Sequence, residues 1–148
     1  MTREGYRLSF APADIDARAA HAFLTDAYWC EGIPLATVER AIAGSLCIAL
    51  HAGSEGQVGF ARVVTDRATF AYLCDVYVLG AHRSRGLATW MLEALFAHPD
   101  LTGLRRFMLF TRDAQALYTG HGFGPLATPK RGMEIVRPGL YLQPAASP

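Results

Sequence analysis

The sequence has little net charge, few cysteines and no long apolar run. Its formal net charge is +1, and charged residues make up 18% of the chain. Proteins that bind nucleic acids gain affinity when many cationic side chains release counterions from the phosphates. A net charge near zero argues against such a broad basic surface, so any cationic site must be local. No stretch approaches the roughly 20 apolar residues of a membrane span. Met1 to Phe10 also lack the apolar core of a signal peptide, so we expect a cytoplasmic protein that does not act at a membrane.

The cysteines and histidines show no metal-ligand spacing. Cys30, Cys47 and Cys74 are far apart and form no C-x-x-C pair, which argues against a disulfide framework or a zinc ribbon. Free buried thiols are therefore expected. The five histidines are scattered as well, so we expect no metal.

The chain length and the apolar fraction suit one hydrophobic core. The chain has 148 residues, of which 51% are apolar, unlike the composition of disordered segments. No linker, repeat or low-complexity segment divides it. We expect a single domain over residues 1–148, with the last five residues, 144–148, frayed.

Apolar periodicity predicts an α/β domain with a run of antiparallel strands. Alternating or β-branched and aromatic segments predict strands at Tyr6–Phe10, Leu46–His51, Gln57–Thr65, Thr69–Leu79, Arg106–Thr111, Met133–Val136 and Leu140–Leu142. Spacings of three and four residues predict helices over Asp14–Tyr28, between Pro34 and Gly44, between Gly86 and Pro99, and over Ala114–Thr119. Short turns join the three strands from Leu46 to Leu79, which should therefore be antiparallel neighbours.

The most informative stretch, Val76 to Ala88, is a strand, an Arg- and Gly-bearing turn and a helix in direct succession. Backbone N–H groups at a helix start lack intrahelical partners and lie at the positive end of the helix dipole, so they can hold a phosphate. Gly86 lets the main chain come close to such an anion, and Arg83 and Arg85 can add charge-assisted hydrogen bonds. The competing interpretation is that both arginines merely face water. The glycine patterns of Rossmann and P-loop phosphate sites are absent.

This stretch resembles the pyrophosphate signature of the Gcn5-related N-acetyltransferase (GNAT) family. The signature, Arg or Gln, two residues, Gly, one residue, then Gly or Ala, matches Arg83-Ser84-Arg85-Gly86-Leu87-Ala88. A second mark of the family, Leu-Tyr, three residues, Gly-Phe, matches the residues from Leu117 to Phe123. The order of the elements agrees too, so the resemblance covers nearly the whole chain. It implies one GNAT domain with a mixed, mostly antiparallel sheet in which strands Thr69–Leu79 and Arg106–Thr111 splay apart.

The resemblance implies an enzyme that moves an acetyl group from acetyl-coenzyme A (acetyl-CoA) directly to a primary amine of a small molecule or peptide, without a metal. In this family the six signature residues hold the pyrophosphate. The backbone of Tyr77, Val78 and Leu79 would pair with the pantetheine arm and supply an N–H for the thioester oxygen. Asp113 stands where an asparagine that contacts pantetheine is common. The family's acid, which protonates the leaving thiolate, falls on Tyr118, for which a core aromatic is the competing interpretation.

The general base is less well defined by the sequence. Histone-modifying members place a glutamate on the strand before the signature, and Tyr72 occupies that position here. Asp75 is the substitute that we favour, because a carboxylate in an apolar strand is costly to bury without a partner and a substrate ammonium would be one. A structural hydrogen bond of Asp75, loss of the proton through water, and a base at Glu31 or Asp66 stay open.

Three further residues lie near the expected site. Tyr28, Trp29 and Glu31 occupy the helix connection that commonly covers the acceptor pocket in this family, although a plain core role for Trp29 is equally open. Cys74 is expected in the core rather than as a nucleophile.

Two other functions stay in view. A non-catalytic acyl-CoA sensor on the same fold would be marked by the loss of Tyr118, which is present. A nucleic-acid-binding module would use Arg83, Arg85, Arg105 and Arg106, but the near-neutral charge and the lack of an aromatic stripe argue against it. The sequence does not determine the acceptor, the acyl-chain preference or the oligomeric state, and a homodimer stays open because many relatives dimerise.

Overall fold

The computed structural model describes residues 1–143, so the frayed end predicted for 144–148 lies outside the described residues. A six-stranded sheet in the order β1-β2-β3-β4-β5-β6 forms its centre. The strands are β1 (Thr2–Arg3), β2 (Tyr6–Ser9), β3 (Leu46–Ala52), β4 (Gly56–Thr65), β5 (Phe70–Val78) and β6 (Arg106–Leu109). Neighbouring strands are antiparallel except β5 and β6, which are parallel. The predicted α/β fold with a mixed, mostly antiparallel sheet is confirmed.

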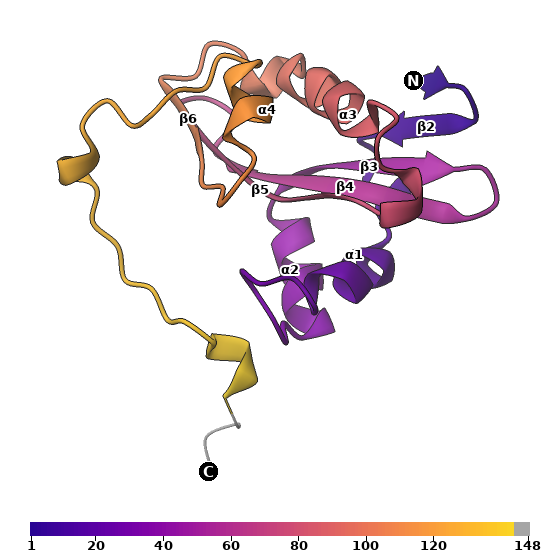
Figure 1. Ribbon diagram of the computed structural model, residues 1–148, viewed down its shortest axis with the longest axis horizontal. Coiled ribbons are helices and arrows are strands. Elements are labelled where there is room, and N and C mark those ends of the chain that lie inside the picture. The colour runs from indigo at the N-terminus through magenta and orange to yellow at the C-terminus, as the bar shows by residue number, and fades with distance from the viewer. Residues whose placement is uncertain (144–148) are drawn as a thin grey trace.

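Helices cover both faces of the sheet (Figure 1). They are α1 (Ala17–Leu24), α2 (Leu35–Ala43), α3 (Leu87–Phe96) and α4 (Gln115–Thr119). Helices α1 and α2 lie on one face, and α3 and α4 lie on the other (Figure 1). Single 3-10 turns occur at Pro12–Asp14, Gly80–His82, Pro99–Leu101, Pro129–Arg131 and Leu140–Leu142. Among residues 1–143, no helix is long and apolar enough to cross a membrane.

Each face of the sheet has its own apolar cluster. The larger cluster joins the sheet to α3 and includes Ile48, Leu50, Met91, Leu92 and Leu95. The smaller one joins it to α1 and α2 and includes Ala20, Leu24, Val38, Phe60 and Tyr77. Successive strand residues point to opposite faces, which is why one strand can serve both clusters. Burying each large apolar side chain contributes about 1.5–3 kcal/mol, so the two clusters hold β5 and the start of α3 in a fixed frame.

The first helix is shorter than its sequence pattern predicts. The pattern covers Asp14–Tyr28, but α1 begins at Ala17 and ends at Leu24. Asp16 sets the start as the N-cap, since its Oδ1 accepts a hydrogen bond from the backbone N–H of Ala19 at 3.0 Å. Turns follow the helix up to Gly32. The two-residue strand β1 is too short to be recognised by alternation.

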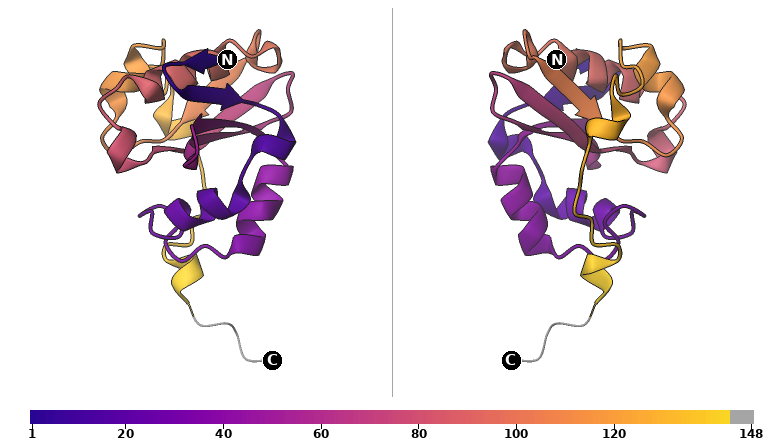
Figure 2. Two further views of the ribbon diagram at one scale, coloured as in Figure 1. Left: turned by 90° about the vertical axis from the view of Figure 1, so that its right-hand side faces the viewer. Right: turned by 90° about the vertical axis from the view of Figure 1, so that its left-hand side faces the viewer.

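The predicted closing strands at Met133–Val136 and Leu140–Leu142 are wrong. Residues 132–137 have no regular secondary structure, and Leu140–Leu142 form a 3-10 turn. After α4 the chain leaves the body as an extended segment, residues 124–142, which we call the C-terminal arm (Figures 1 and 2). A strand needs a neighbour for its N–H and C=O groups, and the arm runs away from β6, the sheet edge that it would have to join.

Candidate active site

Strands β5 and β6 lie side by side over only part of their length. The parallel register pairs Phe70–Leu73 with Arg106–Leu109 and then ends, while β5 continues to Val78. A strand without a neighbour presents free N–H and C=O groups on that side. Cys74–Val78 therefore offer main-chain groups to a ligand, except that the Val78 carbonyl oxygen already accepts a hydrogen bond from Arg83 Nε. The predicted divergence of these two strands is confirmed.

A β-bulge interrupts β5 where the divergence begins. Between the pairs Phe60–Tyr77 and Arg62–Cys74, two residues of β5 oppose one residue of β4. Asp75, one of the two, has a φ of 55°, a left-handed conformation that is uncommon for residues other than glycine. Bulges of this kind redirect side chains and are frequent next to active sites.

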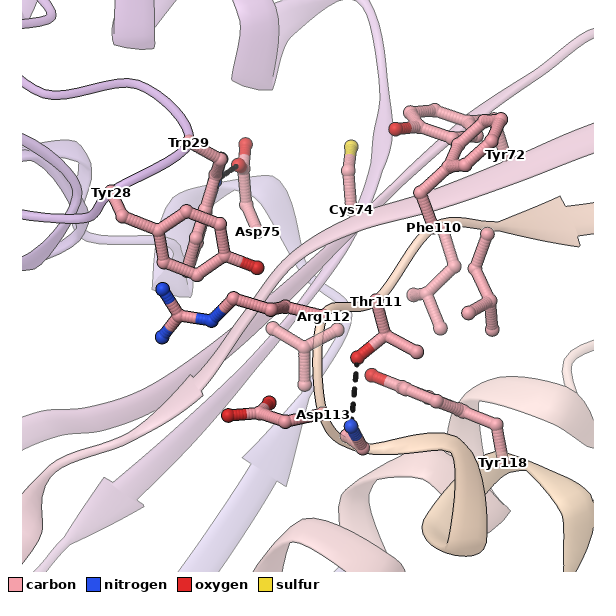
Figure 3. A pocket seen from close by; sticks show the side chains of 14 residues that line it. Tyr28, Trp29, Tyr72, Cys74, Asp75, Phe110, Thr111, Arg112, Asp113 and Tyr118 are labelled. Atoms are coloured by element: carbon pink, nitrogen blue, oxygen red, sulfur yellow. Dashed lines mark hydrogen bonds between the residues drawn. The ribbon is translucent and has the colours of Figure 1, made fainter.

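The Asp75 carboxylate binds a donor with each of its oxygens. Arg62 Nε on β4 donates to Oδ2 at 2.7 Å. Trp29 Nε1 in the α1–α2 connection donates to Oδ1 at 2.9 Å, as Figure 3 shows. The side chains of Arg62 and Asp75 are 18% and 11% exposed, so the pair is largely removed from solvent. Of the two roles that the sequence left open, the hydrogen-bonded one is thus observed, and the role as general base stays a prediction.

Trp29 and Asp75 border a cleft of about 370 Å³ (Figure 3). One wall is the α1–α2 connection with Tyr28 and Trp29, residues 72–76 of β5 form the base, and the other wall is the β6–α4 loop with Tyr118 behind it. The Arg112 guanidinium carbon lies 3.9 Å from the centre of the Tyr28 ring, a cation–π contact that joins the two walls. Arg112 belongs to no motif and could not be selected from the sequence.

The structure brings the two predicted catalytic residues and Asp113 to this one cleft. Asp75 lies on β5, Tyr118 on α4, and Asp113 just before α4, exposed at the loop. Thr111 Oγ1 accepts a hydrogen bond from the N–H of Ala114 at 3.0 Å and shapes the entry to this short helix.

Tyr118 is the buried side chain of α4, and its hydroxyl points toward Thr111 and the cleft (Figure 3). Burial raises the pKa of its phenol above the ordinary value. The hydroxyl is therefore protonated at neutral pH and able to donate a proton. Within residues 1–143 it forms no hydrogen bond, which leaves it available to a bound molecule.

The three cysteines are free thiols, as expected for the described residues. Burial raises the pKa of Cys74, which lines the cleft, to about 12. It raises that of Cys30 to about 11 and that of Cys47 to about 12. The thiolate is the reactive form of cysteine, so Cys74 is poorly suited to form an acyl-enzyme at neutral pH.

The Arg- and Gly-bearing turn lies at the other end of β5, where α3 begins. Gly86 is the N-cap of α3 with a φ of 71°, and no side chain caps the helix. The N–H groups of Leu87, Ala88 and Thr89 have no partner among residues 1–143, as expected for a first helical turn. These three residues line a hollow of about 230 Å³. Its other lining residues are Val78, His82, Arg83, Ser84 and Gly86. A Cβ on Gly86 would meet no atom within 4 Å, so the space above the main chain is open.

Arg83 and Arg85 flank this hollow from the exposed turn. Arg83 Nε donates to the carbonyl oxygen of Val78 at 2.8 Å, and Arg85 Nη1 donates to the Tyr6 hydroxyl at 3.1 Å. Each guanidinium has five N–H donors in all, so each keeps donors for a ligand. These contacts hold both arginine side chains beside the open start of α3.

A family model described as an acetyltransferase (GNAT) domain matches residues 43–125, which include both sequence marks, the diverging strands and Tyr118. The chain belongs to the GNAT family. A relative from Gibberella zeae, provisionally named an acetyltransferase, is 33% identical over 140 residues, covering 79% of this chain and 77% of that protein. These similarities support acetyl transfer in general terms.

Solved structures agree with the GNAT assignment. A crystal structure from Xanthomonas campestris pv. campestris, assigned provisionally to the GNAT acetyltransferases, is 45% identical and has a TM-score of 0.91. The match covers 96% of this chain and 100% of that one. Glucosamine-6-phosphate N-acetyltransferase from Arabidopsis thaliana shares the fold alone, with 11% identity, a TM-score of 0.65, and coverage of 90% of this chain and 98% of that one.

In this GNAT chain a buried histidine supports the turn before α3. His82 is 7% exposed; its Nδ1 lies 2.8 Å from the Tyr6 hydroxyl and its Nε2 lies 2.9 Å from Glu55 Oε2. An ionised carboxylate can only accept hydrogen bonds, so in a neutral imidazole the Nε2–H group donates to Glu55. Nδ1 then accepts a hydrogen bond from the Tyr6 hydroxyl, and the Tyr6 oxygen accepts one from Arg85. The network ties the turn to β2 and to the β3–β4 hairpin. Sequence reasoning missed it because Tyr6 lies 76 residues away from His82 along the chain.

The alternative bases lie elsewhere in this GNAT domain. Asp66 is in the β4–β5 turn, where hydrogen bonds from the Thr69 hydroxyl and from neighbouring backbone N–H groups hold its pKa well below its usual range. Glu31 lies beside the C-terminal arm, not in the cleft. Residues 1–143 bring together no group of three or more His, Cys, Asp or Glu side chains that could hold a metal.

Proposed function

We propose that this chain transfers the acetyl group of acetyl-CoA directly to a primary amine of a small molecule or peptide. The observation that carries the proposal is the order of three features along β5. The open start of α3 adjoins Val78, the unpaired strand edge follows at Cys74–Val78, and the cleft with Tyr118 lies at residues 72–76. A long donor with an anionic end, an amide-rich arm and a reactive thioester matches this order.

The anionic end of the donor suits the turn before α3. The pyrophosphate would accept hydrogen bonds from the first N–H groups of α3 and from Arg83 and Arg85, and Ser84 and Gly86 would let it approach the main chain. The amides of the pantetheine arm would pair with free main-chain groups of β5, and Asp113 could accept one further amide N–H. Leu79 does not fit this role, because its N–H donates to the Val58 carbonyl oxygen at 2.8 Å and its C=O accepts from the His82 N–H at 2.9 Å. The open start of α3 and the unpaired edge of β5 support binding of an acyl-CoA, which has an anionic end and an amide-bearing arm.

The chemistry would take place at the diverging end of β5. The amine nitrogen attacks the thioester carbonyl, and a β5 N–H group binds the oxygen that becomes negative; one such donor is commonly worth about 3–4 kcal/mol. The C–S bond then breaks, and the sulfur takes the Tyr118 proton. The phenolate is reprotonated by the proton that the amine loses.

Asp75 is the residue that we propose to take the first proton, which the substrate ammonium loses before the attack, directly or through a water, and to pass it on to solvent. The second proton, which the nitrogen loses after the attack, is the one that returns to Tyr118. Each carboxylate oxygen can accept two hydrogen bonds, so a substrate ammonium can bind beside Arg62 and Trp29. The cleft is lined by aromatic rings together with the charged side chains of Asp75, Arg112 and Asp113, so it suits an amine that carries an apolar part.

A thiol-release assay with a panel of amines tests the proposal. Amino acids, polyamines, aminoglycosides and peptides with free N-termini are offered with acetyl-CoA, and calorimetry measures acetyl-CoA binding in parallel. We expect turnover with at least one amine, lost in Tyr118→Phe and kept in Tyr141→Phe, a matched loss of a phenol hydroxyl outside the cleft. Absence of acetyl-CoA binding would refute the proposal, and binding without turnover on any amine would favour the sensor.

A further inference from the structure

Arg112 carries a positive charge in the cleft that no described residue neutralises. It belongs to the β6–α4 loop, lines the cleft and has an exposed side chain. Among residues 1–143 it forms no ion pair and no side-chain hydrogen bond, whereas three other arginines pair with carboxylates. Its guanidinium carbon lies 3.9 Å from the centre of the Tyr28 ring, a contact that uses none of its N–H donors in a hydrogen bond. These donors are therefore available to a molecule in the cleft.

A chain of contacts fixes Arg112 relative to Asp75. Trp29 donates to the Asp75 carboxylate at 2.9 Å, and the rings of Trp29 and Tyr28 meet edge-on with their centres 5.1 Å apart. Tyr28 in turn contacts the Arg112 guanidinium. In Figure 3 the guanidinium and the Asp75 carboxylate lie near the same pair of aromatic rings. The cleft thus presents one positive and one negative group whose separation is set by the packing of these two rings.

The charges around the cleft balance one another. Asp75 and Asp113 contribute two negative charges, and Arg112 contributes one positive charge. Arg62, which is bound to Asp75, contributes the second positive charge. A polyamine or an aminoglycoside would bring several positive charges close to Arg112, and like charges repel. A zwitterion has no net charge and can place a charge of the opposite sign against both Asp75 and Arg112.

We propose that the acceptor is a small amine that also carries a carboxylate, such as a free amino acid, and that Arg112 binds this carboxylate while the ammonium lies at Asp75. An arginine matches a carboxylate with two parallel N–H···O bonds, and it can stay stacked on an aromatic ring while it does so. The aromatic rings of the cleft would cover the apolar part of the acceptor. This inference rests on the proposed acetyl transfer and names the class of acceptor for it.

Matched pairs of acceptors test the proposal. Amino acids with the carboxylate on the α carbon or farther from the amine are each compared with their primary amide, which keeps the amine and removes the negative charge. The two amines of a pair differ in basicity, so the quantity compared is the ratio of kcat/KM for the acid to that for the amide. Arg112→Met keeps an apolar stem against Tyr28 and should lower this ratio by about 10- to 150-fold for at least one pair. Arg112→Lys restores the charge without the planar fork and should recover part of it.

Arg105→Met is the matched control, because Arg105 is exposed outside the cleft, and it should leave the ratio unchanged. Three results would overturn the carboxylate subsite and leave acetyl transfer intact. They are an equal loss of rate for acid and amide in Arg112→Met, an effect of that variant confined to acetyl-CoA affinity in calorimetry, and a parent that prefers amides, polyamines or aminoglycosides. If the parent acetylates no amine at all, the proposed function itself fails and the acceptor class falls with it.

Discussion

Replacing Tyr118 by Phe separates proton donation from packing. The side chain is 8% exposed and lies edge-on to Phe123, with ring centres 6.0 Å apart. Phe keeps these contacts and removes only a hydroxyl that has no partner within residues 1–143. The free energy of unfolding should therefore change by less than about 1 kcal/mol, which is at most roughly 4 °C in Tm for a chain of this size.

The catalytic effect of Tyr118→Phe should be much larger than the structural one. A positioned general acid contributes roughly 10²- to 10⁴-fold, so the activation barrier should rise by about 2.7–5.5 kcal/mol with acetyl-CoA affinity almost unchanged. Steady-state kinetics and calorimetry measure the two effects separately.

The pH dependence gives a second readout of Tyr118→Phe. Because burial raises the pKa of Tyr118, the acid form is complete at neutral pH and is lost only as the pH rises beyond about 10. The parent should lose rate in that alkaline range, and the variant should lack this decline. Unchanged turnover, or joint loss of affinity and Tm, would refute the assignment of Tyr118 as the acid.

Three further variants test the rest of the site. Arg83→Ala should weaken acetyl-CoA binding by about 1.5–3 kcal/mol in calorimetry, and an unchanged affinity would contradict the anion site. Gly86→Val should keep its circular dichroism yet lose binding, because a side chain would occupy the open space above a residue with φ 71°; an unfolded or fully active variant would contradict this. Arg62→Met leaves Asp75 without its buried partner and should cost about 3–5 kcal/mol in urea unfolding, most of it recovered when Asp75→Asn is added. If Asp75 is the base, Asp75→Asn alone should lose rate most at low pH, and a flat pH profile would remove it from the mechanism.

Elements with their own local signals could be predicted from the sequence. Strands β3 and β4 match their predicted ranges to within one residue, because glycine-containing turns interrupt clear apolar runs. The prediction of a strand at Met133–Val136 was wrong for a specific reason. Alternation indicates that a segment has two faces, but it does not indicate which neighbour supplies the hydrogen bonds, and none of the residues that the structure describes does so.

The candidate site shows the same difference between local sequence signals and long-range contacts. Gly86 and Tyr118 could be selected because each belongs to a short motif within one strand–turn–helix or helix–turn unit. The bond between Trp29 and Asp75 could not be foreseen, since it joins residues 46 apart across a bulge that no local pattern indicates. The contact of Arg112 with Tyr28 is equally long-range. Such contacts depend on the finished packing of two loops.

The unpaired side of β5 exposes chemical groups that every amino acid shares. A donor recognised through Cys74–Val78 would be insensitive to most substitutions there that preserve the strand. The cleft walls, in contrast, consist of the side chains of Tyr28, Trp29, Phe110 and Arg112, carried by two loops outside the sheet. If the proposed function is right, the donor is held largely by main-chain groups and the acceptor largely by loop side chains, so the choice of acceptor could diverge by changes in these loops with little effect on the donor.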